Sequence, residues 1–243
     1  MRRFALIGNP LTHSFSKSYF QSKFEREGIE DATYENIEIA SEEELKNLLA
    51  QKHFDGFNIT IPWKEAVLKL ADEVSNECKS IQSANVLKLT DAGYKAYNTD
   101  YIGFQETLKP LLKPYHTAAL ILGNGGSSKA IAYVLEQLDI DYRVATRNKT
   151  QGHFINYGAI RTIDVRNAGI IINTTPLGMH PHVGSFPEIP YEGMDKFHLA
   201  YDLIYNPAET QFLKKANLQG AMTKNGYDML IRQAEESWKI WNN

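Results

Sequence analysis

Short apolar runs alternate with amphipathic stretches along the chain, in the order that βαβ units produce. The first half contains predicted strands, helices and one hairpin, at residues 4–8 (strand), 16–27 (helix), 33–39 (strand), 41–52 (helix), 56–61 (strand), 63–74 (helix) and 84–100 (hairpin). Ser41, with Glu44 three residues later, is a capping box that marks the start of one of these helices.

A second series of elements begins near residue 117, and its strands are apolar on both faces, as in a buried parallel sheet. Its predicted elements are, in order, residues 118–122 (strand), 126–138 (helix), 142–148 (strand), 168–176 (strand), 198–207 (strand), 208–219 (helix) and 227–241 (helix). Strands that alternate with helices in this way predict a doubly wound, nucleotide-binding fold. The chain is therefore expected to be of the α/β class.

Composition excludes several classes of protein. The 243 residues are 43% hydrophobic, and the formal net charge of −3 gives no reason to expect nucleic acid or an anionic membrane as a partner. The longest apolar runs have the length of strands and cannot span a bilayer. Cys78 is alone, which suits a reducing compartment, and the N-terminus predicts a first strand and no signal peptide. We expect a cytoplasmic protein that holds any anionic ligand through local donors.

The turn "GNGGSSKA" at residues 123–130 carries the first chemical indication. Gly123 permits a tight turn after the strand, Gly125 lets the backbone approach a pyrophosphate, and the small Ser128 allows close packing of helix on strand. The amides at the start of the helix, where Gly126 and Ser127 lie, would receive the negative charge. An ordinary strand-to-helix turn is the alternative interpretation.

The next strand ends in "ATRNKT", which indicates the kind of dinucleotide. An NAD site usually has an acidic residue here, whereas this chain has Thr146 and Arg147. A guanidinium can hold a 2′-phosphate with two parallel hydrogen bonds, so the expected cofactor is NADP (NADPH). The alternative is that Arg147 and Lys149 belong to a solvated loop.

No metal site is expected from the sequence. The seven histidines are scattered along the chain, and even His180 and His182 lie in a proline-rich loop.

Motifs along nearly the whole chain resemble those of the shikimate dehydrogenase family, in the order of that family. These motifs are "GNPLTHSFS" (8–16), "NITIPWK" (58–64), "NTDYIG" (98–103), "GNGGSSKA" (123–130), "INTTPLGM" (172–179), "DLIYNPAETQFL" (202–213) and "NGYDMLIRQA" (225–234). The resemblance implies a reversible, NADPH-dependent reduction of 3-dehydroshikimate to shikimate, in the biosynthesis of chorismate and the aromatic amino acids.

The resemblance also assigns roles to individual residues. It implies that Lys64 and Asp100 are the catalytic pair. It implies that the substrate carboxylate is held by Ser14 and Ser16. The residues that would contact the ring hydroxyls are Thr60, Asn85, Tyr205 and Gln233. Hydroxyl and amide groups are what a polyol requires. Near the cofactor, the resemblance places Leu203, Gly226 and Met229.

The resemblance further implies two α/β domains with a cleft between them. Residues 1–101 with 226–243 would form the substrate-binding and catalytic domain, and residues 102–225 the Rossmann-type NADP-binding domain. Compared with the family, residues 149–165 are expected to be a shortened loop on the adenosine side. The expected assembly is a monomer or a homodimer, with a small-molecule substrate as partner.

Several alternatives stay open at this stage. Lys64 could be an ordinary solvated lysine in the first turn of a helix, and "HSFS" could be only a helix cap. The protein could act on another ring, such as quinate, with broader specificity. It could also be a sensor that binds NADP or a metabolite without catalysis, although a sensor has no need of Lys64 and Asp100.

Overall fold

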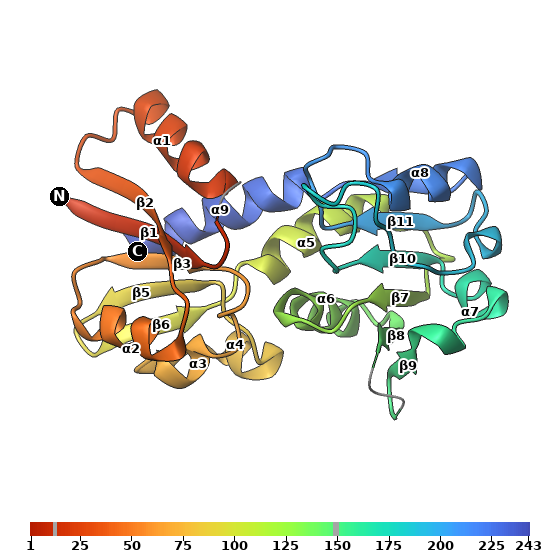
Figure 1. Ribbon diagram of the computed structural model, residues 1–243, viewed down its shortest axis with the longest axis horizontal. Coiled ribbons are helices and arrows are strands. Elements are labelled where there is room, and N and C mark those ends of the chain that lie inside the picture. The colour runs from red at the N-terminus through yellow and green to blue at the C-terminus, as the bar shows by residue number, and fades with distance from the viewer. Residues whose placement is uncertain (12–13, 148–150) are drawn as a thin grey trace. The chain divides into compact units, whose positions relative to one another are not determined.

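The computed structural model describes residues 1–11, 14–147 and 151–243 (Figure 1). Thr12 and His13 of the first motif, and Lys149 of "ATRNKT", lie outside the described residues. The chain divides into two compact units, which are described separately. Unit 1 comprises Met1–Thr99 and Gln233–Asn243, and unit 2 comprises Asp100–Arg232.

Unit 1 contains a mixed six-stranded sheet in the order β2-β1-β3-β5-β6-β4. Its strands are β1 (Arg2–Gly8), β2 (Ala32–Glu38), β3 (Gly56–Ile59), β4 (Glu73–Val74), β5 (Val86–Thr90) and β6 (Gly93–Tyr97). β1 lies parallel to both β2 and β3, whereas β5 runs antiparallel to β3 and to β6. The predicted hairpin is confirmed, because Thr90 pairs with Gly93 across the turn.

Helices cover both faces of this sheet. They are α1 (Phe15–Glu27), α2 (Glu42–Ala50), α3 (Val67–Leu70), α4 (Asn76–Ile81) and the second part of α9 (Tyr227–Asn242). Successive residues of β1 point to opposite faces. Phe4 packs in one cluster with Phe20 of α1 and Trp241 of α9, and Ala5 packs in another cluster with Leu45 of α2.

Unit 2 contains a six-stranded sheet in which all neighbouring strands are parallel, in the order β12-β11-β10-β7-β8-β9. Its strands are β7 (Ala118–Leu122), β8 (Asp141–Thr146), β9 (Phe154–Asn156), β10 (Ile170–Asn173), β11 (Leu199–Asp202) and β12 (Met222–Lys224). This is the strand order of a Rossmann fold, and the order reverses between β7 and β10, where ligands of such sheets bind.

The helices of unit 2 are α5 (Asp100–Leu108), α6 (Gly126–Gln137), α7 (Thr162–Arg166), α8 (Gln211–Leu218) and the first part of α9, with short 3₁₀ turns η1 (Lys109–Leu111), η2 (Tyr157–Ala159) and η3 (Tyr191–Gly193). Ile131 and Val134 of α6 are fully buried in one cluster with Ile121 of β7. Phe212 of α8 packs with Leu120 on the other face. The predicted α/β fold with a Rossmann-type sheet is confirmed.

The predicted helix at residues 63–74 is wrong over most of its length. Turns run from Ile61 to Ala66, and helical structure begins only at Val67. The physical reason is a hydrogen bond outside the helix. The carbonyl of Lys64 accepts from the amide of Ala84 (2.8 Å), and not from an amide one helical turn further along the chain. Glu73 and Val74 form a strand beside β6.

The described part of the range where a shortened loop is expected, residues 151–165, contains regular secondary structure. β9, η2 and α7 all lie in or overlap this range, and β9 pairs with β8 as the edge of the sheet. Three residues are too few to show a period-two pattern in the sequence.

Candidate active site

Ser14 precedes α1 and has the extended backbone of an N-cap residue (φ −67°, ψ 123°). Its side chain makes no capping hydrogen bond, and its Oγ is buried with no hydrogen-bond partner among the described residues. Buried hydroxyls are normally satisfied, so an orphan of this kind requires an explanation. Among the described residues, Ser14 is therefore a capping residue only in its backbone geometry.

Ser16 lies in the first turn of α1 and is 9% exposed. It interacts with the hydroxyl of Tyr34 on β2, a buried group whose pKa is raised by burial. The Tyr34 hydroxyl also donates to Oδ1 of Asn58 on β3 (2.7 Å). Ser16 thus lies beside a hydrogen-bonded pair of the sheet, Tyr34 and Asn58, which sequence analysis did not single out.

A buried network of amides and hydroxyls continues from Asn58. The Asn58 side-chain amide donates to Ser237 Oγ on α9 (3.0 Å), which in turn donates to the carbonyl of Gln233 (2.7 Å). Asn85 Nδ2 lies 2.9 Å from Thr99 Oγ1 and 3.3 Å from Gln233 Oε1. Asn85 and Gln233, which sequence analysis assigned to one substrate, are therefore brought together.

Thr60 and Lys64 follow the carboxyl end of β3. The amide of Thr60 donates to the carbonyl of Ile7 on β1 (2.8 Å), which fixes the residue beside the end of the neighbouring strand. Lys64 is half-buried in the turn that follows. The backbone of Lys64 is held in this turn by the hydrogen bond that its carbonyl accepts from the amide of Ala84.

Asp100 and Tyr205 belong to unit 2. Asp100 is the first residue of α5 and is 5% exposed. Carboxylates are favoured at helix N-termini, because the helix dipole places positive charge there. Tyr205 is half-buried in the loop after β11.

The glycine turn lies at the reversal point of the unit 2 sheet. Gly123 has φ +111°, and a Cβ there would come within 2.7 Å of Thr174 Oγ1 after β10. Gly125 is the N-cap of α6, and a Cβ there would meet nothing within 4 Å. Ser128 is 2% exposed, and its hydroxyl donates to the carbonyl of Gly125 (2.7 Å). Gly126 and Ser127 are the first two residues of α6.

These residues fit the phosphate groups of a dinucleotide. The N-terminal amides of a helix are free to donate to an anion, and the helix dipole favours negative charge at this end. The space around Gly125 lets such a group approach the backbone. The predicted roles of Gly123 and Ser128 in the turn agree with this geometry.

Thr146 is the last residue of β8, Arg147 follows it, and the Arg147 side chain is exposed. The carbonyl of Arg147 accepts a hydrogen bond from Asn156 Nδ2 (2.8 Å). Tyr157, which sequence analysis missed, has a buried hydroxyl with no hydrogen-bond partner in the described part of the chain. Burial raises the pKa of Tyr157, and the charge of Arg147 acts in the opposite direction. A cation and an orphan hydroxyl thus lie near the end of β8.

Leu203 and Gly226 are in direct contact. The amide of Gly226 donates to the carbonyl of Ile204 (3.0 Å), and a Cβ on Gly226 would lie 2.0 Å from the carbonyl oxygen of Leu203. Met229 is 7% exposed and packs in the same apolar cluster as Leu203. The backbone segments of Leu203 and Gly226, both predicted to face the cofactor, therefore touch each other. Met229 also packs in the apolar core of unit 2.

Asp202, at the end of β11, is fully buried and was not singled out from the sequence. Its carboxylate accepts hydrogen bonds from Thr210 Oγ1 (2.6 Å), Asn173 Nδ2 (3.0 Å) and the amide of Ile204 (3.0 Å). Burial nevertheless raises the pKa of Asp202 to about 6. This carboxylate ties together the loops that follow β10 and β11.

Among residues 1–11, 14–147 and 151–243, no group of three or more His, Cys, Asp or Glu side chains is placed to hold a metal ion. Within the same described residues, no helix has both the length and the apolar character needed to cross a membrane.

Comparison with known proteins agrees with this geometry. A family model for the shikimate dehydrogenase substrate binding domain matches residues 6–87. Shikimate dehydrogenase (NADP⁺) of Staphylococcus epidermidis is 35% identical over 252 aligned positions, which cover 99% of this chain and 92% of that protein.

Solved structures are similar over the same length. Shikimate 5-dehydrogenase of Thermus thermophilus, in complex with NADP(H) and shikimate, is 30% identical with a TM-score of 0.87, covering 99% of this chain and 93% of that one. Quinate dehydrogenase of Corynebacterium glutamicum, in complex with NAD, is 27% identical with a TM-score of 0.86 and the same coverage. With more than a third of its residues identical to those of a relative that it matches almost from end to end, the chain belongs to the shikimate dehydrogenase family.

Proposed function

We propose that the protein catalyses the reversible reduction of 3-dehydroshikimate to shikimate with NADPH. The observation that carries this proposal is the Ser14 hydroxyl, which is buried without a partner among the described residues, at the position where the family holds the substrate carboxylate. The buried network around Asn85 and Gln233 gives further support, because it presents amide groups suited to ring hydroxyls.

Substrate binding uses hydroxyl and amide donors. Ser14 and Ser16 donate to the carboxylate. The ring hydroxyls are contacted by Thr60, Asn85, Tyr205 and Gln233. Hydrogen bonds to a charged group contribute about 1.5–3 kcal/mol each, so the two serines would dominate the affinity for the acid.

Lys64 acts on the oxygen of the ring ketone. When bound, NADPH supplies a hydride to the carbonyl carbon. The Lys64 ammonium then provides a proton or a charge-assisted hydrogen bond to the oxygen as it gains negative charge. Asp100 orients Lys64 and favours its charged form. In the reverse direction Lys64 must be neutral to accept a proton.

The cofactor is held by the Rossmann-type unit. The amides that follow Gly123 and Gly125, including those of Gly126 and Ser127, would bind the pyrophosphate. Thr146 and Arg147 would bind the 2′-phosphate, which makes NADP the preferred dinucleotide. Leu203, Gly226 and Met229 would lie on the nicotinamide side.

The second candidate function is a quinate/shikimate dehydrogenase of broader specificity, which the likeness to quinate dehydrogenase favours. A sensor that binds NADP without catalysis remains the third, and the retained Lys64 and Asp100 count against it. We further propose a cytoplasmic location, which the single cysteine supports. The assembly, a monomer or homodimer, stays a prediction.

One absorbance assay separates these functions. Purified protein is mixed with shikimate or quinate and with NADP⁺ or NAD⁺, and the appearance of reduced cofactor is followed in the near ultraviolet. We expect the highest kcat/KM for shikimate with NADP⁺. Comparable values for quinate would support the broader enzyme, and no turnover with any pair, by protein that binds NADP⁺, would support the sensor.

A further inference from the structure

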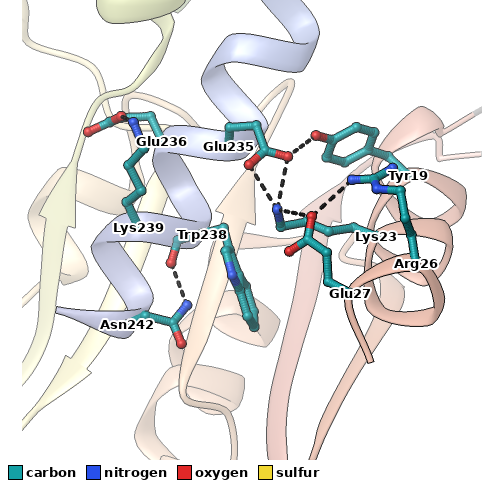
Figure 2. Close-up of polar contacts among 9 residues, drawn as sticks. All are labelled: Tyr19, Lys23, Arg26, Glu27, Glu235, Glu236, Trp238, Lys239 and Asn242. Carbon is teal, nitrogen blue, oxygen red and sulfur yellow. Dashed lines mark hydrogen bonds and ion pairs between the residues drawn. The ribbon is translucent and has the colours of Figure 1, made fainter. Parts of the chain in front are cut away.

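Lys23 of α1 is a nearly buried lysine, 4% exposed, for which the proposed reaction has no use. Figure 2 shows it between two carboxylates. Its Nζ lies 2.8 and 3.1 Å from the two carboxylate oxygens of Glu235 on α9, and 2.9 Å from Glu27 Oε1. The hydroxyl of Tyr19 donates to the same Glu235 carboxylate. α1 and α9 are thus joined by charged hydrogen bonds.

Both members of the central pair remain ionised. Burial alone would lower the pKa of Lys23, but its hydrogen bonds to Glu235 and Glu27 outweigh burial and raise it. Burial would raise the pKa of Glu235, yet the hydrogen bonds from Lys23 and Tyr19 lower it below its usual range. The contact is therefore a true ion pair over the pH range in which such an enzyme works.

A pair of this kind adds little to stability, because desolvation of the two charges offsets most of their attraction. Apolar packing already joins the helices, since Phe20 and Phe24 of α1 lie against Trp238 of α9. Apolar contacts are non-directional and permit small sliding movements, whereas charged hydrogen bonds need a defined geometry. The distinctive contribution of Lys23 and Glu235 is to fix the register of the two helices.

That register matters for the substrate residues that the two helices carry, Ser16 in the first turn of α1 and Gln233 in the first half of α9. On α1, Ser16, Tyr19 and Lys23 recur at spacings of three and four residues, which places them on one face. On α9, Glu235 lies two residues after Gln233. A shift of one helix against the other would change the separation between the serines and Gln233.

We propose that Lys23, Tyr19 and Glu235 are positioning residues, which hold the carboxylate-binding end of α1 at a fixed distance from Gln233. This inference rests on the proposed function, since Ser14, Ser16 and Gln233 are its substrate residues. A small misplacement of groups that bind one rigid ligand can cost up to about a hundredfold in rate or affinity.

The test uses the full-length protein and steady-state kinetics. Lys23→Met removes the ammonium but keeps an unbranched apolar chain, and should raise KM for shikimate by about tenfold. KM for NADP⁺ and kcat should stay within about twofold, because neither depends on the carboxylate end. Glu235→Gln, whose amide oxygen still accepts hydrogen bonds, should have a smaller effect in the same direction.

Lys239→Met is the matched control. Lys239 pairs with Glu236 on α9 at 2.9 Å, and Figure 2 shows this pair on the opposite side of α9 from α1. The control variant should leave both KM values unchanged.

A double-mutant cycle separates positioning from a merely structural role. Lys23→Met and Ser16→Ala should be non-additive in KM for shikimate, because once the serine contact is lost its position no longer matters. Simple loss of stability would lower the active fraction and leave KM alone. Additive effects, or a folded Lys23→Met protein with unchanged KM for shikimate, would overturn the inference.

If Lys23→Met does not fold, Glu235→Gln is judged by the same criterion, and an unchanged KM again overturns the inference. A wild-type protein that turns over neither shikimate nor quinate would remove the proposed function and this inference together. An active wild type whose variants behave as the control would remove the inference alone.

Discussion

The two units arrange their candidate binding residues in different ways. In unit 1 the residues assigned to the substrate are side chains, and those of Asn85 and Gln233 hydrogen-bond each other inside a network of buried amides and hydroxyls. In unit 2 the residues assigned to the cofactor are mainly backbone positions at strand ends, and Gly125 has open space before it.

The buried polar groups differ in charge as well. The network around Asn85 consists of neutral groups, whereas that at the end of β11 is centred on the carboxylate of Asp202. Neutral side chains select the shape of a small polyol, and a glycine turn accepts any pyrophosphate. We infer that specificity for the ring depends mainly on unit 1, with Tyr205 as the contribution of unit 2, and that specificity for the dinucleotide depends on few residues of unit 2.

The largest expected effect is at Lys64. Lys64→Ala should lower kcat by roughly 10²–10⁴ while KM for shikimate changes by less than about tenfold. Asp100→Ala should cause a similar loss, and the double variant should be scarcely worse than either, because the two residues act as a unit. The exposed Lys69 of α3 provides the control, Lys69→Ala. A folded Lys64→Ala protein that keeps more than about a tenth of wild-type kcat would contradict the catalytic assignment.

The second effect is a pH dependence of the free energy of unfolding. It is expected for the network around Asp202 and not for the neutral network around Asn85. Because burial raises the pKa of Asp202 from 3.8 to about 6, its protonated form stabilises the fold below about pH 4, and this stability is lost as the pH rises through 6. At about 1.4 kcal/mol per unit, the loss is at most about 3 kcal/mol.

Urea unfolding of the wild type and Asp202→Asn at several pH values measures this loss. The wild type should lose stability relative to the variant between about pH 4 and pH 7, while contributions of other groups cancel. Ser237→Ala, in the neutral network, should differ from the wild type by the same amount at every pH. A constant difference for Asp202→Asn as well would show that Asp202 titrates normally.

Arg147 should decide the choice of dinucleotide. Loss of a charge-assisted contact to the 2′-phosphate should lower the ratio of kcat/KM for NADP⁺ to that for NAD⁺ by roughly ten- to a hundredfold in Arg147→Ala. Arg143, which lies on β8 four residues before Arg147, pairs with Asp164, so Arg143→Ala is a suitable control. An unchanged ratio in the Arg147 variant would refute the interpretation of "ATRNKT".

Gly125 and Gly123 should respond differently to the same change. Gly125→Ala places a methyl group in open space and should raise KM for NADP⁺ by about tenfold, at a stability cost below about 1 kcal/mol. Gly123→Ala should destabilise the protein more, because its φ of +111° and the nearby Thr174 exclude a Cβ. Equal stability of both variants in thermal unfolding would contradict the observed turn.

The smallest effect is expected at Ser14. Ser14→Ala should raise KM for shikimate several-fold and leave the free energy of unfolding unchanged within about 0.5 kcal/mol, because the hydroxyl has no partner among the described residues to lose. Ser16→Ala should also destabilise the protein, by about 1 kcal/mol, because it loses its polar contact with Tyr34. The Ser14,Ser16 double variant with an unchanged KM would restore the interpretation of "HSFS" as a helix cap only.

Local patterns in the sequence predicted much of this structure. The Ser41 cap is confirmed, because its hydroxyl accepts from the amide of Glu44 (3.2 Å), and α1 ends at Gly28 with φ +65°. Helix caps and helix ends depend on residues that are only a few positions apart in the sequence. The glycine turn after β7 was predictable for the same reason.

Contacts between distant residues could not be predicted in the same way. Ser237 lies 179 positions from Asn58, and Lys23 lies 212 positions from Glu235. In the sequence, a serine or lysine on a helix is most often solvated. The start of α3 was mispredicted for a related reason, since the partner of the Lys64 carbonyl is Ala84, on a different segment.

The division of α9 between the two units has a consequence for synthesis on the ribosome. Trp241 stacks on Phe4 of β1, and its indole donates to the carbonyl of Leu87 on β5 (3.0 Å). Unit 1 therefore needs residues Gln233–Asn243, which are synthesised after all of unit 2. Unit 2, Asp100–Arg232, can assemble without them. Until α9 arrives, Phe4 and Phe20 lack the cover of Trp238 and Trp241 on the nascent chain, and this apolar face is where we expect a chaperone to be needed.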